Sequence, residues 1–416
     1  MAMPTRENSA AKANAQPTAE STVMPTYTLW SLAGYFVKLG TLGFGGPVAL
    51  VGYMNRDLVE RRHWILEADY KEGLTLAQLA PGPLAAQLAI YLGFVHYRVV
   101  GATIAGLAFV LPSFLMVVAL GWSYVHYEGL PWMQSVFYGI GASVIGIIIH
   151  SAYKLTVKTV GKRLLLWVIY LVSASWTVVT ETENVWLFLT AGIITWMVKA
   201  PPRFLRGSRV RSLLASLPLG AAIPLASQSE PQLLWRMLLF FAKAGAFVFG
   251  SGLAIVPFLR SGVVKEFHWL DDQQFLDAVA VAMITPGPVV ITVGFIGYLV
   301  AGIAGACVAA LGVFLPCYFF TVIPAPYFSR YGKRPALIAF VDGVTAAAIG
   351  AITGAVIILG RQTLWNAGGE LQILKVVLLA ATLACVWSKR KIPEPLIILS
   401  AAIFGLIVSS LHLARG

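Results

Sequence analysis

Charged side chains are scarce in this sequence. Asp, Glu, Lys and Arg make up 12% of its 416 residues, whereas a soluble globular domain carries about 25%. Hydrophobic residues make up 58%, and the mean hydropathy is +0.79. Apolar runs long enough to cross a hydrocarbon core of about 30 Å recur from Trp30 to His412. The composition excludes a soluble globular protein and predicts an all-α integral membrane protein in contact with a lipid bilayer.

Cysteine and catalytic motifs are also scarce. Cys307, Cys317 and Cys385 lie in apolar stretches without a CxxC motif or a nearby histidine pair, so no metal site or disulfide framework is expected. The sequence has no P-loop, HExxH motif, Ser-His-Asp set or dinucleotide fingerprint. We therefore predict no cofactor and no enzymatic activity, and an ATP-driven pump would need a second chain.

The net charge of +12 does not indicate nucleic-acid binding. Most Lys and Arg residues lie in short loops between apolar runs, as the positive-inside rule of membrane proteins requires. Residues 1–26 are rich in Ala, Ser, Thr, Pro and Asn and contain no apolar core, so we expect a disordered cytoplasmic tail and no signal peptide.

The sequence repeats itself at an offset of 205 residues. YFVKLGTLGFGGPVAL (35–50) aligns with FFAKAGAFVFGSGLAI (240–255), and Pro-Gly-Pro occurs at 81–83 and again at 286–288. A slip of one residue then keeps further identities in register. Two homologous halves are predicted. We place the first transmembrane domain at 27–211, a linking span at 212–232 and the second domain at 233–416.

Thirteen transmembrane segments are expected, near 30–54, 73–97, 100–123, 131–152, 164–180, 184–199, 212–227, 233–259, 276–299, 303–325, 336–360, 371–387 and 393–411. Segment 212–227 is short and contains two prolines. With it, 20 loop cations lie inside and 6 outside; without it the numbers are 14 and 12. The charge rule therefore favours this segment. An odd number of crossings places the halves in inverted orientation, in an inner membrane, with a cytoplasmic N-terminus and a periplasmic C-terminus.

Both halves contain helix breakers at corresponding positions. Broken transmembrane helices persist only where protein or water covers the break, and they expose amide N–H groups at the positive end of a helix dipole. Paired interruptions in two halves indicate a transport site near the midplane. The alternative is kinking or tight packing. The predicted substrate-binding residues at the breaks are Gly45, Gly46, Pro47, Pro81, Gly82, Pro83, Gly250, Ser251, Gly252, Pro286, Gly287 and Pro288.

Polar side chains near the breaks complete the predicted site. Lys38 and Lys243 occupy matched positions and can approach one dianion from two sides, unless they snorkel to an interface. Carboxylates inside the spans are few, which favours an anionic substrate. Asp342 is placed inside a span, where it relays a proton or lies near the headgroups. Three further residues donate hydrogen bonds to an oxyanion or bond within the helices: Gln87, Thr285 and Thr292.

These motifs resemble those of a known family. FGGPVAL (44–50) and APGPLAAQ (80–87), with the second copies FGSGLAI (249–255) and TPGPVVIT (285–292), are similar to the chromate ion transporter (CHR) family in its long, two-domain form. The resemblance covers nearly the whole chain beyond the tail. It implies export of chromate, and resistance to it, driven by the membrane potential or the proton gradient, with sulfate as a competitor.

One position departs from the family pattern. Many members carry GGPxAH at the first motif, whereas this sequence has Leu50 in place of the histidine and Ile255 in the second half. No histidine can titrate at this point.

Three functions compete. The first is a secondary transporter that exports chromate by proton-coupled transport or exchange. The second is an uptake permease or exchanger for sulfate or another tetrahedral oxyanion. The third is a membrane-embedded enzyme acting on a lipid phosphate, for which the mixed-charge loop 55–72 is the one candidate cluster. The resemblance favours the first, with a homodimer left open.

Overall fold

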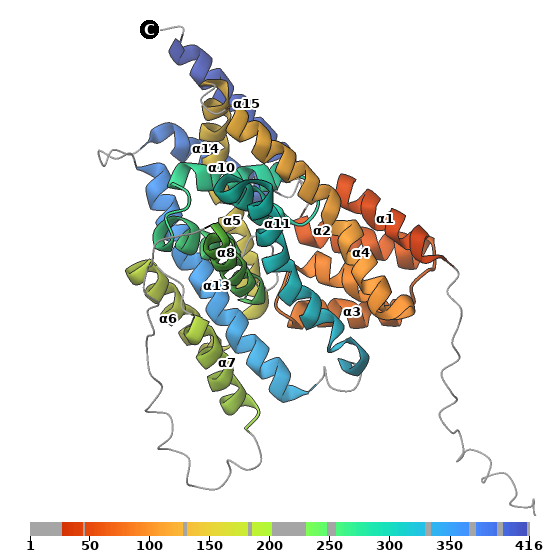
Figure 1. Ribbon diagram of the computed structural model, residues 1–416. Coiled ribbons are helices and arrows are strands. Elements are labelled where there is room, and N and C mark those ends of the chain that lie inside the picture. Colours follow the sequence, from red (N-terminus) through yellow and green to blue (C-terminus); the bar gives the residue numbers. More distant parts are fainter. Residues whose placement is uncertain are drawn as a thin grey trace, which may run out of the picture.

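The computed structural model describes residues 27–44, 46–127, 131–181, 185–201, 230–247, 255–328, 334–365, 372–388 and 394–413. Within these ranges every element is a helix (Figure 1). The predicted tail and the disputed segment 212–227 lie outside them.

The elements fall into two series with the same order. The first is α1 (Leu29–Leu42), α2 (Gly46–Met54), η1 (Asn55–Arg61), α3 (Glu67–Leu79), α4 (Leu84–His126), α5 (Pro131–Thr159), α6 (Leu164–Thr180) and α7 (Val185–Lys199). The second is α8 (Glu230–Phe247), α9 (Ile255–Arg260), η5 (Ser261–Glu266), α10 (Asp272–Ile284), η6 (Val289–Ile291), α11 (Thr292–Val322), η7 (Ala325–Tyr327), α13 (Pro335–Leu364), α14 (Ile373–Trp387) and α15 (Glu394–Leu413).

Rare backbone features recur in both series. A π-helical turn follows α2 as η1 and follows α9 as η5. His63 and His268 both have φ of 51°, and Gly82 and Gly287 also have positive φ. Non-glycine residues seldom adopt positive φ, so a matched pair does not arise by chance packing. The duplication read from the sequence therefore extends to the backbone.

The first two helical segments of each half fold back on themselves. A Cβ on Gly73 would lie 2.2 Å from the ring of Tyr91, although 18 residues of straight helix span about 27 Å. Likewise, the rings of Tyr27 and Trp64 stack 4.9 Å apart. We predicted 30–54 and 73–97 as single spans; each is instead a helical hairpin that turns at its Gly-Pro break, because proline ends one helix and glycine permits the reversal.

Two further reversals lie within α4 and α11. The backbone leaves helical geometry at Arg98 in α4 and at Ala301 and Gly302 in α11. The two arms of each turn pack closely: a Cβ on Gly93 would lie 2.3 Å from the carbonyl oxygen of Gly101. Glycine is needed here because any side chain would separate the arms. After the turn, each half continues as a long helix.

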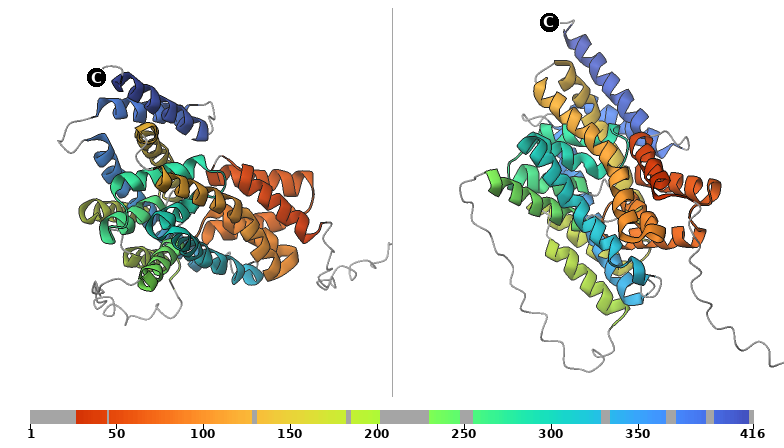
Figure 2. Two further views of the ribbon diagram at one scale, coloured as in Figure 1. Left: turned by 45° about the horizontal axis from the view of Figure 1, so that its top comes forward. Right: turned by 45° about the vertical axis from the view of Figure 1, so that its right-hand side comes forward.

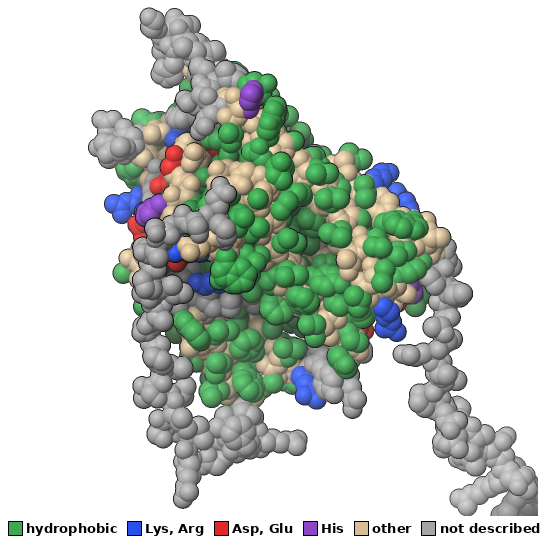
Figure 3. All heavy atoms as spheres, in the orientation of Figure 1, with side chains coloured by type: hydrophobic (Ala, Val, Ile, Leu, Met, Phe, Trp, Pro, Cys, Tyr) green, Lys and Arg blue, Asp and Glu red, His purple; other side chains and the backbone are tan. Residues whose placement is uncertain are grey.

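The long helices are suited to a bilayer. Among the described residues, four helices are long and apolar enough to cross one: Leu84–His126, Gly139–Thr159, Val289–Tyr327 and Pro335–Arg361. Exposed apolar side chains run along α4 and α11 at matched positions: Leu107, Leu111 and Leu115, then Leu311, Leu315 and Phe319. Hydrophobic side chains cover most of the face seen in Figure 3, with Lys and Arg toward its edges. The chain is a membrane-spanning protein.

The halves exchange helices. Helix α5 of the first half packs against α14 and α15 of the second, while α13 of the second half packs against α6 and α7 of the first (Figure 1 and Figure 2). A hydrogen bond joins the helices of the two halves in each case: Ser173 of α6 donates to the carbonyl oxygen of Ala347 in α13, and the Thr382 hydroxyl of α14 contacts the Ser143 hydroxyl of α5. Ser143 and Ala347 are 204 residues apart in the sequence, as the repeat requires. Each half therefore completes the packing of the other.

Candidate functional site

The tip of the hairpin formed by α10 and α11 docks on the first half. The amide of Gly287 donates to the carbonyl oxygen of Gly43, 3.0 Å away, at the break that ends α1. Ser113 of α4 lies beside it and donates to the carbonyl oxygen of Gly40 at 3.1 Å. A Cβ on Gly287 would lie only 1.9 Å from the Ser113 hydroxyl oxygen. Two helix breaks, 244 residues apart in the sequence, thus meet directly.

The tip of the hairpin formed by α3 and α4 has the reciprocal environment. Gly82 has φ of 139°, and a Cβ on it would lie 2.8 Å from the Gln87 side chain and 3.2 Å from Cys317. Cys317 corresponds to Ser113 at an offset of 204. Gly287 has φ of 99°, so both tips need a residue without a Cβ. Each tip therefore packs against the long helix of the other half.

Helix starts follow both tips. Helix α4 begins directly after Pro83 and η6 directly after Pro288, and within the described structure no side chain caps either start. Ala86 and Ile291, in these first turns, are fully buried. Amide groups at an uncapped helix start carry partial positive charge and donate hydrogen bonds. Such helix starts suit an anion, and binding of an oxyanion at these two stays a prediction.

The three predicted hydrogen-bond donors fall into two groups. Gln87 is fully buried; its side-chain nitrogen donates to the carbonyl oxygen of Pro81 at 2.7 Å, and its Oε1 has no partner within the described residues. Thr285 and Thr292 donate to the carbonyl oxygens of Val281 and Val289. The two threonines thus bond to their own helices in this conformation, the alternative weighed from the sequence, while Gln87 orders the tip.

The two lysines lie on exposed surfaces. Lys38 is five residues before the break at Gly43, about 7.5 Å along the axis of α1. The Lys243 ammonium lies 5.8 Å from the centroid of the Phe258 ring, within cation–π range. Neither makes a recorded hydrogen bond or ion pair in the described part of the chain, so their role as counter-charges for a substrate stays a prediction.

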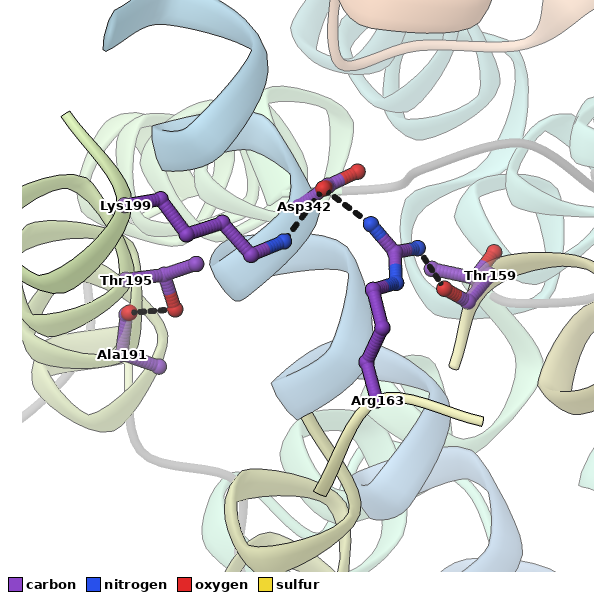
Figure 4. Close-up of polar contacts among 6 residues, drawn as sticks. All are labelled: Thr159, Arg163, Ala191, Thr195, Lys199 and Asp342. Carbon is purple, nitrogen blue, oxygen red and sulfur yellow. Dashed lines mark hydrogen bonds and ion pairs between the residues drawn. The ribbon is translucent and has the colours of Figure 1, made fainter. Parts of the chain in front are cut away.

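Asp342 joins the two halves. Its Oδ2 accepts from Arg163 at 2.5 Å and from Lys199 at 2.9 Å (Figure 4). Arg163 also donates to the carbonyl oxygen of Thr159. Protonation of Asp342 would leave two cations without their shared counter-ion. The predicted proton relay therefore requires these ion pairs to open during transport.

The remaining predicted residues are placed only in part. Gly46 begins α2, and Pro47 is half-buried in its first turn. Gly45, Gly250, Ser251 and Gly252 lie outside the described residues.

Two features of the site were not predicted. Ser113 was missed, although it directly follows Pro112, which matches Pro316 in the repeat alignment. Asp277 was also missed: it is only 4% exposed and accepts a hydrogen bond from Tyr124. Its match to Glu72 at the repeat offset was the available signal.

Known proteins resemble this chain over nearly its full length. A family model described as "Chromate transporter" matches residues 30–196 and again residues 235–406. The "Chromate transport protein" of Cupriavidus metallidurans is 65% identical over 383 residues, which cover 92% of this chain and 94% of the relative. The "Probable chromate transport protein" of Synechococcus elongatus is 62% identical over 389 residues, covering 92% and 97%.

A more distant relative has the same extent. The "Chromate transport protein" of Pseudomonas aeruginosa is 31% identical over 402 residues, which cover 93% of this chain and 94% of the relative. No solved structure is significantly similar to the chain.

Proposed function

Because the chain belongs to the chromate transporter family, we propose that it is a secondary transporter that exports chromate across the inner membrane and confers chromate resistance. The observation that carries the proposed site is the pair of hairpin tips, each packed against the other half. The tips lie where paired helix breaks indicate a transport site.

Chromate is a dianion with four oxygens, each a hydrogen-bond acceptor. In our proposal the uncapped starts of α4 and η6 supply amide donors from two halves, and Gln87 supplies a side-chain donor. Lys38 and Lys243 then balance the two negative charges. In this conformation Gly287 donates to Gly43, so substrate entry needs the tip to move away from α1. That movement would link binding to a change of conformation.

We further propose that the halves have inverted orientation. The contacts between α4 and the first arm of α11 support this, because they advance together along both helices: Ser113 with Gly287, Val117 with Gly294, and Gly121 with Tyr298. These two helical stretches thus run parallel. The first arm of α11 folds back on its second arm, which is the counterpart of α4 beyond Arg98. Equivalent helices then run in opposite directions, the arrangement that supports alternating access.

The hairpins change the count of loop charges. If each hairpin enters and leaves on one side, an inverted arrangement places 22 loop cations inside, and four outside: Arg260, Lys265, Arg361 and Arg415. The same hairpins without an inversion give 20 inside and 6 outside. Both arrangements satisfy the positive-inside rule. The proposal of inversion therefore rests on the helix contacts, and it keeps the N-terminus cytoplasmic and the C-terminus periplasmic.

Transport assays test this function. Cells expressing the protein are expected to accumulate less labelled chromate than cells without it and to grow at higher chromate concentration. Inside-out vesicles are expected to take up chromate, with sulfate competing. Raised chromate accumulation in whole cells would reject export, and sulfate uptake by whole cells without chromate transport would support the permease instead.

A further inference from the structure

A buried carboxylate lies in the hairpin formed by α10 and α11, apart from the tip of that hairpin. Asp277 of α10 is 4% exposed. Its Oδ2 accepts from the Tyr124 hydroxyl and its Oδ1 from the Gln273 amide, each at 2.9 Å. Among the described residues, no Lys, Arg or His lies within 4.0 Å of this carboxylate. Its surroundings are thus two neutral donors within an apolar cluster.

Such surroundings favour exchange of a proton. Burial without a cation disfavours the charged form of a carboxyl group, whereas two hydrogen bonds favour it. The two effects oppose each other, so that both forms are accessible. Asp342 differs, since two cations hold it. Two further acids precede Asp277 on the same element: Asp271 caps the start of α10 by accepting from the backbone of Gln274, and Asp272 pairs with Arg260.

The hydrogen bond to Tyr124 connects the two halves. Tyr124 belongs to α4, and its ring packs edge-on against Phe295 in the returning arm of the hairpin. Asp277 precedes the tip residue Pro286 by nine residues, about 13 Å of helix. The same hairpin docks on α1 through Gly287. A proton on Asp277 therefore alters one of the contacts that hold this hairpin against the first half.

We propose that Asp277 binds and releases the coupling proton, an inference that rests on the proposed function of chromate export. The carboxylate gains a proton from one side of the membrane to become a neutral carboxylic acid, and it releases that proton to the other side of the membrane. Uptake weakens the hydrogen bond from Tyr124 and frees the hairpin to move. In the proposed orientation α10 enters the membrane from outside, where an inward gradient supplies protons.

The first half has no equivalent buried carboxylate bonded to the other half among the described residues. Glu72 corresponds to Asp277 at the repeat offset and interacts with Tyr91, but it is only half-buried. Tyr91 comes from the same hairpin, so this interaction does not connect the halves. Glu72 therefore provides a matched control at the equivalent position.

The test uses the purified full-length protein in liposomes with a trapped pH dye and labelled chromate. With the wild-type protein, an imposed proton gradient is expected to drive chromate against its gradient and to change the dye signal. Asp277→Asn preserves shape and should keep chromate–chromate exchange while it abolishes the response to the gradient. Glu72→Gln should respond like the wild type. In Tyr124→Phe, the pH at which proton-driven chromate transport is half-maximal should rise by about one to two units. The lost hydrogen bond stabilised the charged carboxylate, and such a bond is worth roughly ten- to a hundredfold in ionisation.

The outcomes separate the two proposals. Retained gradient coupling in Asp277→Asn overturns the role of Asp277, and loss of exchange along with coupling also overturns it in favour of a structural role. Wild-type chromate transport without a dye signal overturns the inference but leaves chromate export intact. No chromate flux by the wild type under any gradient rejects the proposed function itself.

Discussion

Replacing Gly287 by Ala should disable the docked hairpin tip. The new Cβ would lie 1.9 Å from the Ser113 hydroxyl oxygen, so Ser113 must move and give up its hydrogen bond to Gly40, a loss of about 1 kcal/mol. The φ of 99° adds backbone strain of roughly 1–3 kcal/mol for a residue with a side chain. Together these destabilise the docked conformation by about 2–4 kcal/mol, a sizeable part of the roughly 5–15 kcal/mol that stabilises a typical folded protein.

Two measurements follow Gly287→Ala: chromate export from cells and thermal unfolding of the purified protein. We expect export to fall strongly and unfolding to occur at lower temperature. Adding Ser113→Ala removes the clashing hydroxyl oxygen, but the backbone strain remains and the hydrogen bond to Gly40 is still lost, so the double variant should be about as unstable as Gly287→Ala alone. Gly52→Ala in α2 is the control, because nothing lies within 4 Å of its Cβ position. Wild-type export and unfolding in Gly287→Ala would refute the reasoning.

Three further predictions concern charge and topology. Lys38→Ala and Lys243→Ala should each abolish chromate resistance without lowering protein abundance; full resistance in both would remove them from the site. Asp342→Asn should destabilise the protein by about 1 kcal/mol or less in thermal unfolding, since its ion pairs are partly exposed, and salt should reduce this effect. An unchanged unfolding temperature at low salt would show that these ion pairs do not stabilise the contact between the halves. Reporter fusions after residues 211 and 230 should report opposite sides of the membrane, and the same side for both would contradict the inverted arrangement.

Local patterns predicted much of the fold. The repeat at offset 205 and the Pro-Gly-Pro breaks identified two halves and interrupted helices, because glycine and proline act on the backbone where they stand. Segment 164–180 coincides with α6. The hairpins were not predicted, since an apolar run of about 25 residues has the same composition whether it crosses the bilayer or returns. Only long-range contacts, such as Gly73 with Tyr91, distinguish the two.

The candidate site was likewise predicted only in its local features. The Pro-Gly-Pro tips emerged from spacing alone, but their partners did not: Gly43 meets Gly287 from the other half, and Asp342 meets Arg163 at a separation of 179 residues. Such pairs depend on how helices pack. The charge count illustrates the same limit, because the preference for 20 and 6 over 14 and 12 assumed that every apolar run crosses.

Because the halves exchange helices, they should stay packed together without the chain segment that links them. Helix α5 would expose the surface that packs against α14 and α15 if the second half were missing, and α13 would expose the surface that packs against α6 and α7 without the first half. A chain cut between Lys199 and Glu230 should therefore yield two fragments that are each insoluble or degraded alone and recover transport only when made together. Each half relies on helices of the other half to complete its packing.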